Sequence, residues 1–366
     1  MNVALIHDFL IQRGGAENVL QELARIYPQS PIFTLLHHPE YSRVVFGDRI
    51  RPSYLQQMPF AQDHYQWYLP LMPSAIESHD LTGYDVVLSS SSAFANGVIT
   101  TPRTVHVCYC HTPTRYLWED THEYVADLPY LSIFKQFLLP VLSRLRVWDY
   151  QAAQRVDAFI ANSKTVQRRI KKYYKQNSTV IYPPVDVQSF SIGSGERTYF
   201  LAGGRLVPYK KIDMVIEAFR ALDMPLKIFG TGSDTDRLRK RAKANVEFVG
   251  QVSEREKRDL FANARAFINP QIEDFGITMV EALASRTPVV AYRAGGAVEI
   301  VEEGKTGVFF DEQTWEGLVD TLMHTDFTRF DPVIIRESAE KFGIDRFERE
   351  IRAFVKYAYQ QHLSPT

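Results

Sequence analysis

The chain has 366 residues, too many for one hydrophobic core of ordinary size and about the number expected for two domains. Hydrophobic residues make up 45% and charged residues 23%, a composition typical of folded globular proteins. With 42 basic and 43 acidic side chains, the net charge gives no indication of a nucleic-acid partner. Cys108 and Cys110 are too few for a disulfide framework or a zinc site, which fits a reducing compartment.

Targeting and membrane signals are weak in this sequence. The first residues carry no basic and apolar leader pattern, and no apolar run approaches the roughly 18–20 residues that span a bilayer. We therefore expect a cytoplasmic protein, with peripheral contact to the inner face of the plasma membrane as the candidate membrane association.

Short β-branched runs alternate with amphipathic helical patterns along the whole chain. This order is typical of βαβ units with buried parallel strands. The expected strands of the first half are 3–7, 31–36, 85–89, 105–110 and 158–161. Those of the second half are 199–202, 226–229, 246–249, 266–268, 289–292 and 307–310. The sequence thus predicts an α/β protein with two doubly wound, Rossmann-like domains.

The break between the halves is visible in the sequence. A Tyr-Pro-Pro-Val-Asp segment at 182–186 is followed by the polar, glycine-containing stretch 191–197. We expect an N-terminal domain over 1–188, a C-terminal domain over 196–345, and an amphipathic helix within 346–366 that packs back toward the N-terminal domain. Because ligands of such sheets bind at the carboxyl ends of the strands, the expected active site is a cleft between the two domains.

The strongest chemical signal lies in the connection from a strand to a helix at 269–281. Glu273 and Glu281 bracket Gly276, which lets a phosphate approach the free N–H groups at the helix start. Glu281 leans back toward that start and can accept hydrogen bonds from ribose hydroxyls. Two solvated glutamates are the alternative for an isolated pair, but the glycine and the strand–loop–helix context favour a sugar, diphosphate and ribose site.

A second loop, 203–211, follows the strand that opens the second half. Arg205 and Lys210 are two cations at a strand's carboxyl end, which suits a diphosphate leaving group on which negative charge accumulates. A solvated basic loop is the alternative for this segment alone. The nearby glutamate motif favours the functional interpretation.

Taken together, Gly-Arg-Leu-x3-Lys at 204–210 and Glu-x7-Glu at 273–281 resemble the retaining glycosyltransferases of family 4. Enzymes of this family have the GT-B fold and use nucleotide diphosphate sugars. Further segments of the chain resemble the family's motifs in order: 14–17, 110–113, 161–163, 182–186, 229–232, 295–299 and 304–307. The chain departs from the family pattern at Lys211, where glycine is common, and at 182–184, where Pro-Asn-Gly is common.

The resemblance implies a metal-independent, retaining hexosyltransferase and gives roles to individual residues. The implied catalytic residues are His111, Glu273, Arg205 and Lys210. The implied donor-binding residues are Gly14, Gly15, Gly204, Arg205, Lys210, Gly230, Glu273, Phe275, Gly276, Ile277, Thr278 and Glu281. For His111, a packed polar residue at a strand end is the alternative.

The donor and acceptor are less closely defined by the sequence. The segments 7–10 and 111–118 resemble enzymes of polysaccharide gene clusters, including the type that builds the cyanobacterial heterocyst envelope. The expected donor is a UDP-sugar, UDP-glucose above all, with GDP-mannose as the alternative. The expected acceptor is a glycan or a polyprenyl-diphosphate-linked glycan. Alternatives from other classes are a nucleotide-sugar epimerase and a non-catalytic nucleotide-sugar-binding protein.

The sequence also carries four weaker signals. Gly230 and Gly232 lack the third glycine of a dinucleotide fingerprint, which disfavours a dehydrogenase. Asp234 and Asp236 match a metal-binding Asp-x-Asp motif, but at a helix start they are expected to cap the helix, so we expect no metal and no other cofactor. The basic run 168–175 and the aromatic-rich segment 130–148 are candidate membrane contacts, with a solvated helix face as the alternative for each.

Overall fold

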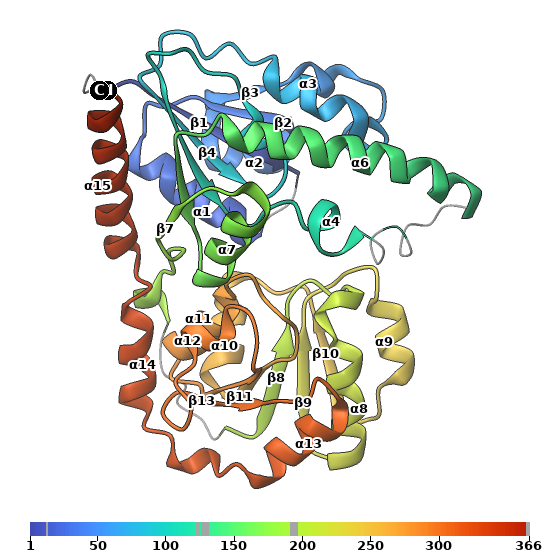
Figure 1. Ribbon diagram of the computed structural model, residues 1–366. Helices are drawn as coiled ribbons and strands as arrows, with labels where there is room; N and C mark the ends of the chain where they lie inside the picture. The colour runs from blue at the N-terminus through green and yellow to red at the C-terminus, as the bar shows by residue number, and fades with distance from the viewer. Residues whose placement is uncertain (12–13, 122–124, 126–131, 191–196, 364–366) are drawn as a thin grey trace. The chain divides into compact units, whose positions relative to one another are not determined.

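A computed structural model describes residues 1–11, 14–121, 125, 132–190 and 197–363 (Figure 1). The chain divides into two units. The first unit comprises Met1–Pro184 and Phe347–Thr366, and the second comprises Val185–Arg346. Each unit is built around its own parallel sheet, which confirms the predicted α/β fold with two doubly wound units.

The first unit has a seven-stranded sheet in the order β3-β2-β1-β4-β5-β6-β7, and every pairing in it is parallel. Its strands are β1 (Val3–Leu10), β2 (Ile32–His37), β3 (Ile50–Pro52), β4 (Val86–Ser91), β5 (Val105–Cys110), β6 (Ala158–Ala161) and β7 (Ser178–Val180). The two edge strands, β3 and β7, are the ones that the sequence did not predict. Both have only three residues and carry few buried apolar side chains.

Helices cover both faces of this sheet. They are α1 (Gly15–Ile26), α2 (Pro39–Phe46), α3 (Met72–Glu77), α4 (Arg115–Trp118), α6 (Ser132–Gln154), α7 (Lys164–Arg169) and α15 (Ile344–Leu363), with a π-helix at Ile170–Tyr174. One apolar core joins the sheet to α1 and α15, and the other joins it to α3 and α6. Short 3-10 turns occupy Gly47–Arg49, Tyr54–Gln57, Tyr65–Leu71 and Ala95–Gly97.

The terminal helix α15, dark red in Figure 1, belongs largely to the first unit. Phe347, Ile351, Val355 and Ala358 are buried in the core that also contains α1. Their spacing of four, four and three residues places them on one helix face. Phe347 meets the Tyr109 ring edge to face at 5.8 Å. Burial of each large side chain contributes about 1.5–3 kcal/mol, so this face holds the helix on the sheet.

The second unit has a six-stranded parallel sheet in the order β10-β9-β8-β11-β12-β13. Its strands are β8 (Tyr199–Gly203), β9 (Leu226–Phe229), β10 (Val246–Gly250), β11 (Ala264–Asn269), β12 (Val289–Tyr292) and β13 (Gly307–Phe310). All six lie where the sequence predicted them, with ends that differ by at most two residues.

The helices of the second unit are α8 (Ile212–Leu222), α9 (Thr235–Arg241), α10 (Glu254–Ala262), α11 (Ile277–Ala284), α12 (Ala297–Ile300), α13 (Trp315–His324) and α14 (Pro332–Glu340). Short 3-10 turns lie at Val187–Ser189, Pro208–Lys210 and Phe327–Arg329. The core against α8 and α13 contains Phe219, Ile228 and Leu318. An aromatic row of Phe229, Phe261 and Phe267 links the sheet to α10, with ring centroids 5.8 and 5.2 Å apart.

The unit boundary differs slightly from the predicted domain ends at 188 and 196. The Val185 amide donates to the Phe342 carbonyl at 2.9 Å, and Val185 also forms a bridge with Gly343. These bonds assign the segment after Pro184 to the second unit. The predicted linker 191–197 lies outside the described residues except for Arg197, which donates to the Arg286 carbonyl at 2.7 Å.

Candidate functional site

In each unit, predicted site residues lie where the strand order of the sheet reverses. In the second unit this point lies between β8 and β11, and the loops that follow these strands carry Arg205, Lys210 and Glu273. In the first unit it lies between β1 and β4, and His111 follows the neighbouring strand β5. Ligands of open parallel sheets bind outside the carboxyl ends of the strands at such points. Each unit therefore has one candidate binding edge.

The Glu273 carboxylate is the centre of a polar cluster in the second unit. Lys210 forms an ion pair with Glu273 Oε1, and Gln271 Nε2 donates to the same oxygen at 2.7 Å. Gln271 is buried and also donates to Asn269 Oδ1 at 2.9 Å, which fixes its side chain. Burial disfavours the charge of Lys210, but the Glu273 carboxylate outweighs this effect and raises the Lys210 pKa. Lys210 is therefore a cation at neutral pH.

Tyr209 contacts both predicted phosphate-binding cations. Arg205 Nη2 donates to the Tyr209 hydroxyl at 3.3 Å, and Lys210 Nζ lies 5.4 Å from the Tyr209 ring centroid. Arg205 is exposed, whereas the Lys210 side chain is 17% exposed. The loop after β8 thus presents one solvent-accessible and one half-buried positive charge. No local pattern in the sequence indicates Tyr209, because its contacts with Arg205 and Lys210 depend on the folded loop.

The start of α11 is shaped by Gly276. This residue is the N-cap of the helix and has φ +106°, a left-handed conformation that favours glycine. No side chain caps the helix, and its first turn, Ile277–Met279, contains no acidic residue. Phe275, which precedes Gly276, is buried against the Phe342 ring at 5.4 Å. Ile277 and Thr278 are half-buried, and their amides are suited to an anion, because the first N–H groups of a helix have no intrahelical partner.

Glu281 is buried on α11 and forms an ion pair with Lys257 from α10. Lys257 Nζ lies 2.8 Å from Glu281 Oε1 and 3.0 Å from Glu254 Oε2. Glu281 Oε2 has no hydrogen-bond partner within the described part of the chain. Burial raises the Glu281 pKa, and the nearby Lys257 ammonium opposes that rise. One carboxylate oxygen is thus buried without a hydrogen-bond partner in the described chain.

Gly204 and Gly230 make the close approach of two loops possible. A Cβ on Gly230, which has φ +102°, would lie 1.8 Å from the Gly204 carbonyl oxygen. A Cβ on Gly204 would meet open space, although its φ is +125°. The Gly230 amide donates to the Gly250 carbonyl at 2.6 Å. The structure therefore gives Gly230 a packing role beside β8, whatever it does toward a ligand.

In the first unit, Gly14 and Gly15 begin α1 after β1. Gly14 is the N-cap and Gly15 the first helical residue, while residues 12 and 13 lie outside the described chain. Glu17, in the first turn, is buried, and its Oε1 lies 3.9 Å from His7 Nε2. A Cβ on Gly14 would lie 2.9 Å from Glu17 Oε2. The small residue thus leaves room for a buried carboxylate at the helix start.

His111 is buried and hydrogen-bonded from the neighbouring strand. Its Nε2 lies 2.8 Å from the Ser90 hydroxyl oxygen, and its backbone amide donates to the Ser91 carbonyl at 2.8 Å. Burial, with a smaller contribution from His7, lowers the His111 pKa to about 3. The imidazole is therefore neutral at physiological pH, which suits a hydrogen-bonding role toward a substrate rather than a charged one.

Asp8, to which the sequence motifs assign no role, organises the loop that follows β4. Its carboxylate accepts backbone N–H bonds from Ser92, Ala93, Phe94 and Ala95, at 2.6, 3.0, 2.7 and 2.6 Å. These residues lie 84–87 positions later in the chain, so no local pattern indicates the contact. Asp8 thus holds residues 92–95 in place at the carboxyl end of β4, beside the point where the strand order reverses.

The expected helix cap at Asp234 is wrong. Asp234 is the N-cap of α9, but its side chain accepts no backbone hydrogen bond from the helix. Instead, Arg237 binds both carboxylate oxygens, with Nε 2.5 Å from Oδ1 and Nη2 2.6 Å from Oδ2. An arginine three residues later offers a bidentate, charge-assisted partner that outcompetes the backbone amide. Asp236 lies in the first turn of the helix, as expected.

The two candidate membrane segments differ in what the structure describes. The basic run forms the end of α7 and the π-helix, and Ile170 and Tyr174 on it are buried in an apolar core. Arg169 is committed to ion pairing with Glu119 at 2.8 Å. Much of 130–148 has no described side chains. Among the residues described, no helix is long and apolar enough to cross a membrane.

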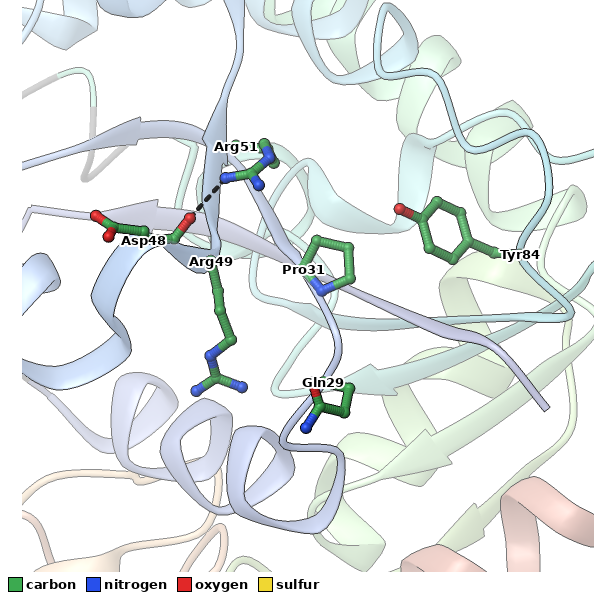
Figure 2. A pocket seen from close by; sticks show the side chains of 6 residues that line it. All are labelled: Gln29, Pro31, Asp48, Arg49, Arg51 and Tyr84. Carbon is green, nitrogen blue, oxygen red and sulfur yellow. Dashed lines mark hydrogen bonds between the residues drawn. The ribbon is translucent and has the colours of Figure 1, made fainter.

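A hollow of about 430 Å³ in the first unit lies away from the predicted residues (Figure 2). It is lined by Gln29, Pro31, Asp48, Arg49, Arg51 and Tyr84. Pro31 precedes β2 and Tyr84 precedes β4, so the hollow lies at the amino ends of the strands. Arg51 donates to the Asp48 carbonyl at 2.7 Å. This hollow is distinct from the carboxyl-end site of His111.

Over the described ranges, no cluster of three acidic, histidine or cysteine side chains could hold a metal.

Comparison with known families gives a consistent result for both units. Residues 13–189 match the model for Glycosyltransferase Family 4, and residues 185–324 match that for Glycosyl transferases group 1. Together, the two matches support a glycosyltransferase of the family 4 type. The two matches follow the unit boundary found in the structure.

Solved structures show the same GT-B fold for this glycosyltransferase-type chain. Anabaena HepE in complex with UDP-glucose has a TM-score of 0.72 at 18% identity, with 98% of this chain and 100% of that chain covered. Sucrose-phosphate synthase from Thermosynechococcus elongatus has a TM-score of 0.72 at 15% identity, with 98% and 100% covered. At such identities the likeness shows the fold alone and not a role in the heterocyst envelope.

Curated relatives of the family 4 type match over shorter regions. An uncharacterized glycosyltransferase of Methanocaldococcus jannaschii is 27% identical over 172 residues, 46% of this chain and 49% of that protein. A GDP-mannose-dependent phosphatidylinositol monomannoside mannosyltransferase of Mycolicibacterium smegmatis is 35% identical over 137 residues, 32% of this chain and 36% of that protein. The chain spans about half the length of the first curated relatives it matches.

Proposed function

We propose that this chain is a retaining, metal-independent hexosyltransferase. It moves a hexose, glucose by preference, from a nucleotide diphosphate sugar to a hydroxyl of a bacterial polysaccharide or lipid-linked glycan. The observation that carries the proposal is the edge of the second sheet between β8 and β11. This edge carries two cations, Arg205 and Lys210. It also carries the start of α11, which no side chain caps, and the buried Glu281, one oxygen of which has no hydrogen-bond partner in the described chain.

Each feature of this edge matches one part of such a donor. Arg205 and Lys210 bind the diphosphate, and the amides at the start of α11 bind its remaining oxygens. Glu281 Oε2 accepts a hydrogen bond from a ribose hydroxyl. Glu273, held by Lys210 and Gln271, contacts the transferred sugar. In the first unit, the neutral imidazole of His111 suits a hydrogen bond to a substrate.

The proposed step is attack from the face that the diphosphate leaves. The bond between the anomeric carbon and the diphosphate oxygen breaks, and the acceptor oxygen forms its bond on that same face. The acceptor proton passes to the departing phosphate oxygen. Arg205 and Lys210 stabilise the charge that accumulates there, which is the part a metal ion plays in other enzymes. Glu273 is committed to Lys210 and Gln271, which supports this route over a covalent intermediate on that carboxylate.

Two candidates remain for the nucleotide base of the donor, uracil and guanine. The fold neighbour bound to UDP-glucose supports UDP-glucose, whereas the matches to mannosyltransferases support GDP-mannose. We favour UDP-glucose. We place the reaction in the cytoplasm, with the acceptor presented at the inner face of the plasma membrane when it is lipid-linked.

Transfer is tested by nucleotide release from the full chain in EDTA. UDP-glucose and GDP-mannose are each incubated with the protein, with and without a glycolipid extract as acceptor. We expect nucleotide release that depends on the acceptor and gives an α-linked product from an α-linked donor. Conversion of the donor to an epimer without nucleotide release would identify an epimerase, and binding without either reaction would identify a non-catalytic binding protein.

A further inference from the structure

A buried chain of polar side chains leads from α1 to His111 in the first unit. His7 on β1 and Ser90 on β4 are cross-strand partners in the sheet, and His111 follows β5. Ser90 is fully buried, His7 is 2% exposed and His111 is 8% exposed. Burial leaves each hydrogen on these groups dependent on a protein acceptor.

The position of the His7 proton follows from its contacts. His7 Nδ1 lies 3.1 Å from the Ser90 carbonyl oxygen and 3.1 Å from the Ser90 hydroxyl oxygen. A carbonyl oxygen can only accept, so Nδ1 carries a proton and donates. This holds in either charge state of His7, because the imidazolium also carries a proton on Nδ1. Glu17 Oε1 lies 3.9 Å from the other ring nitrogen.

The Ser90 hydroxyl hydrogen then has one destination. Within the described residues, the Ser90 hydroxyl contacts only His7 Nδ1 and His111 Nε2, the latter at 2.8 Å. Since His7 donates, the Ser90 hydrogen points to His111 Nε2, which accepts. The reverse arrangement would bury the Ser90 hydrogen without an acceptor. His111 is neutral, because burial lowers its pKa to about 3, so its single proton is on Nδ1.

We propose that Ser90, oriented by His7, is a positioning residue that fixes the proton of His111 on Nδ1. His111 then presents a hydrogen-bond donor to the substrate, and it does not act as a general base through that atom. The inference rests on the proposed function for its consequence in turnover, but the proton position is a property of the free protein. The segments that resemble family motifs assign no role to Ser90 or His7.

The tautomer is measured by ¹⁵N correlation spectroscopy of the imidazole nitrogens in the full chain at pH 7. The His111 signals are assigned by their loss in His111→Asn. We expect a protonated signal for Nδ1 and an unprotonated one for Nε2, and a mixture of the two tautomers in Ser90→Ala. A proton on His111 Nε2 in the native chain would overturn the inference.

Kinetics provide the second test and a matched control. Ser89 lies one residue earlier and makes the same kind of bond, 2.9 Å from His106 Nε2. Ser90→Ala is expected to lower kcat about tenfold with KM for the donor changed less than twofold, whereas Ser89→Ala leaves kcat unchanged. The amide nitrogen of His111→Asn takes the place of Nδ1, whereas that of His111→Gln takes the place of Nε2. We therefore expect His111→Asn to retain about tenfold more activity than His111→Gln.

The two proposals fail in different ways. Equal effects of the two serine substitutions, or higher activity of His111→Gln, would contradict the positioning role. A native chain that consumes no donor would contradict the proposed function, while the tautomer measurement would still decide the inference.

Discussion

Lys257 Nζ lies 2.8 Å from Glu281 Oε1, and Glu281 Oε2 has no partner within the described chain. One oxygen of a buried carboxylate is thus paired with an ammonium from α10, and the other is buried without a hydrogen-bond partner in the described chain. Because burial alone raises the Glu281 pKa, the ammonium is what favours the ionised form. An ionised carboxylate is the stronger acceptor for a hydroxyl.

Lys257→Met is expected to weaken nucleotide binding about tenfold and to lower the free energy of unfolding by about 3 kcal/mol. Removal of one partner leaves the other charge buried and unpaired. Calorimetric titration and chemical denaturation measure the two effects. Lys227→Met is the control, because Lys227 pairs with the exposed Glu247 at 3.1 Å and should change stability by less than about 1 kcal/mol. Equal losses in the two variants would contradict a special role for Lys257.

Gly276→Ala is expected to weaken nucleotide binding more than tenfold. Its φ of +106° disfavours any side chain, and a Cβ would lie 2.2 Å from the Met279 methyl carbon at the start of α11. Gly304 has φ +74° and open space around its Cβ, so Gly304→Ala isolates the backbone cost of about 1–2 kcal/mol. The control should lose stability but bind nucleotide normally. If both variants bind alike, the helix start does not contact the ligand.

The buried carboxyl of Asp149 predicts a pH-dependent stability. Burial raises its pKa from 3.8 to about 7, although Trp118 Nε1 donates to it at 2.6 Å and the Tyr174 hydroxyl at 3.0 Å. A carboxyl with a raised folded-state pKa stabilises the protein fully below pH 3.8 and loses that contribution as pH rises to about 7. Native stability relative to Asp149→Asn should therefore fall by about 2–3 kcal/mol between pH 5 and pH 7. Denaturation at the two pH values checks this, and a constant difference would refute it.

The buried imidazole of His106 should change the stability with pH in the opposite direction. Burial, with a smaller effect of Arg155, lowers its pKa from 6.5 to about 3. A histidine with a lowered folded-state pKa contributes stability that is present above pH 6.5 and lost as pH falls. Between pH 6.5 and pH 5 the free energy of unfolding of the native chain should fall by about 2 kcal/mol more than that of His106→Gln. The same denaturation series measures it, and parallel losses in both chains would exclude His106 as the cause.

Much of the fold could be predicted because its strands are buried parallel runs. Segments such as 105–110 and 226–229 read as apolar strands and occur with those bounds. The edge strands β3 and β7 were missed because Arg51, Pro52 and Thr179 give no apolar signal. An edge strand has one partner and a more exposed surface, so its composition is less constrained.

The site could be predicted only in part, because local motifs do not contain long-range contacts. The glycine and glutamate spacing at 273–281 indicated the start of α11 and the place of Glu281. The partners Lys257 and Ser90 come from other elements, and nothing beside them in the chain marks them. Asp234 was misread because an arginine three residues later competes with the helix amides.

The most direct test is calorimetric titration of the full chain with UDP, UDP-glucose, GDP and GDP-mannose in the presence of EDTA. The same titrations are made with the native chain, Lys210→Met and Arg220→Met. Arg220 lies on the surface of α8 and pairs with Glu217, so its removal controls for loss of a positive charge. Our proposal predicts metal-free binding of one nucleotide family, UDP by preference, weakened at least tenfold in Lys210→Met and unchanged in Arg220→Met. Absence of binding to all four, or equal binding by all three proteins, would contradict it.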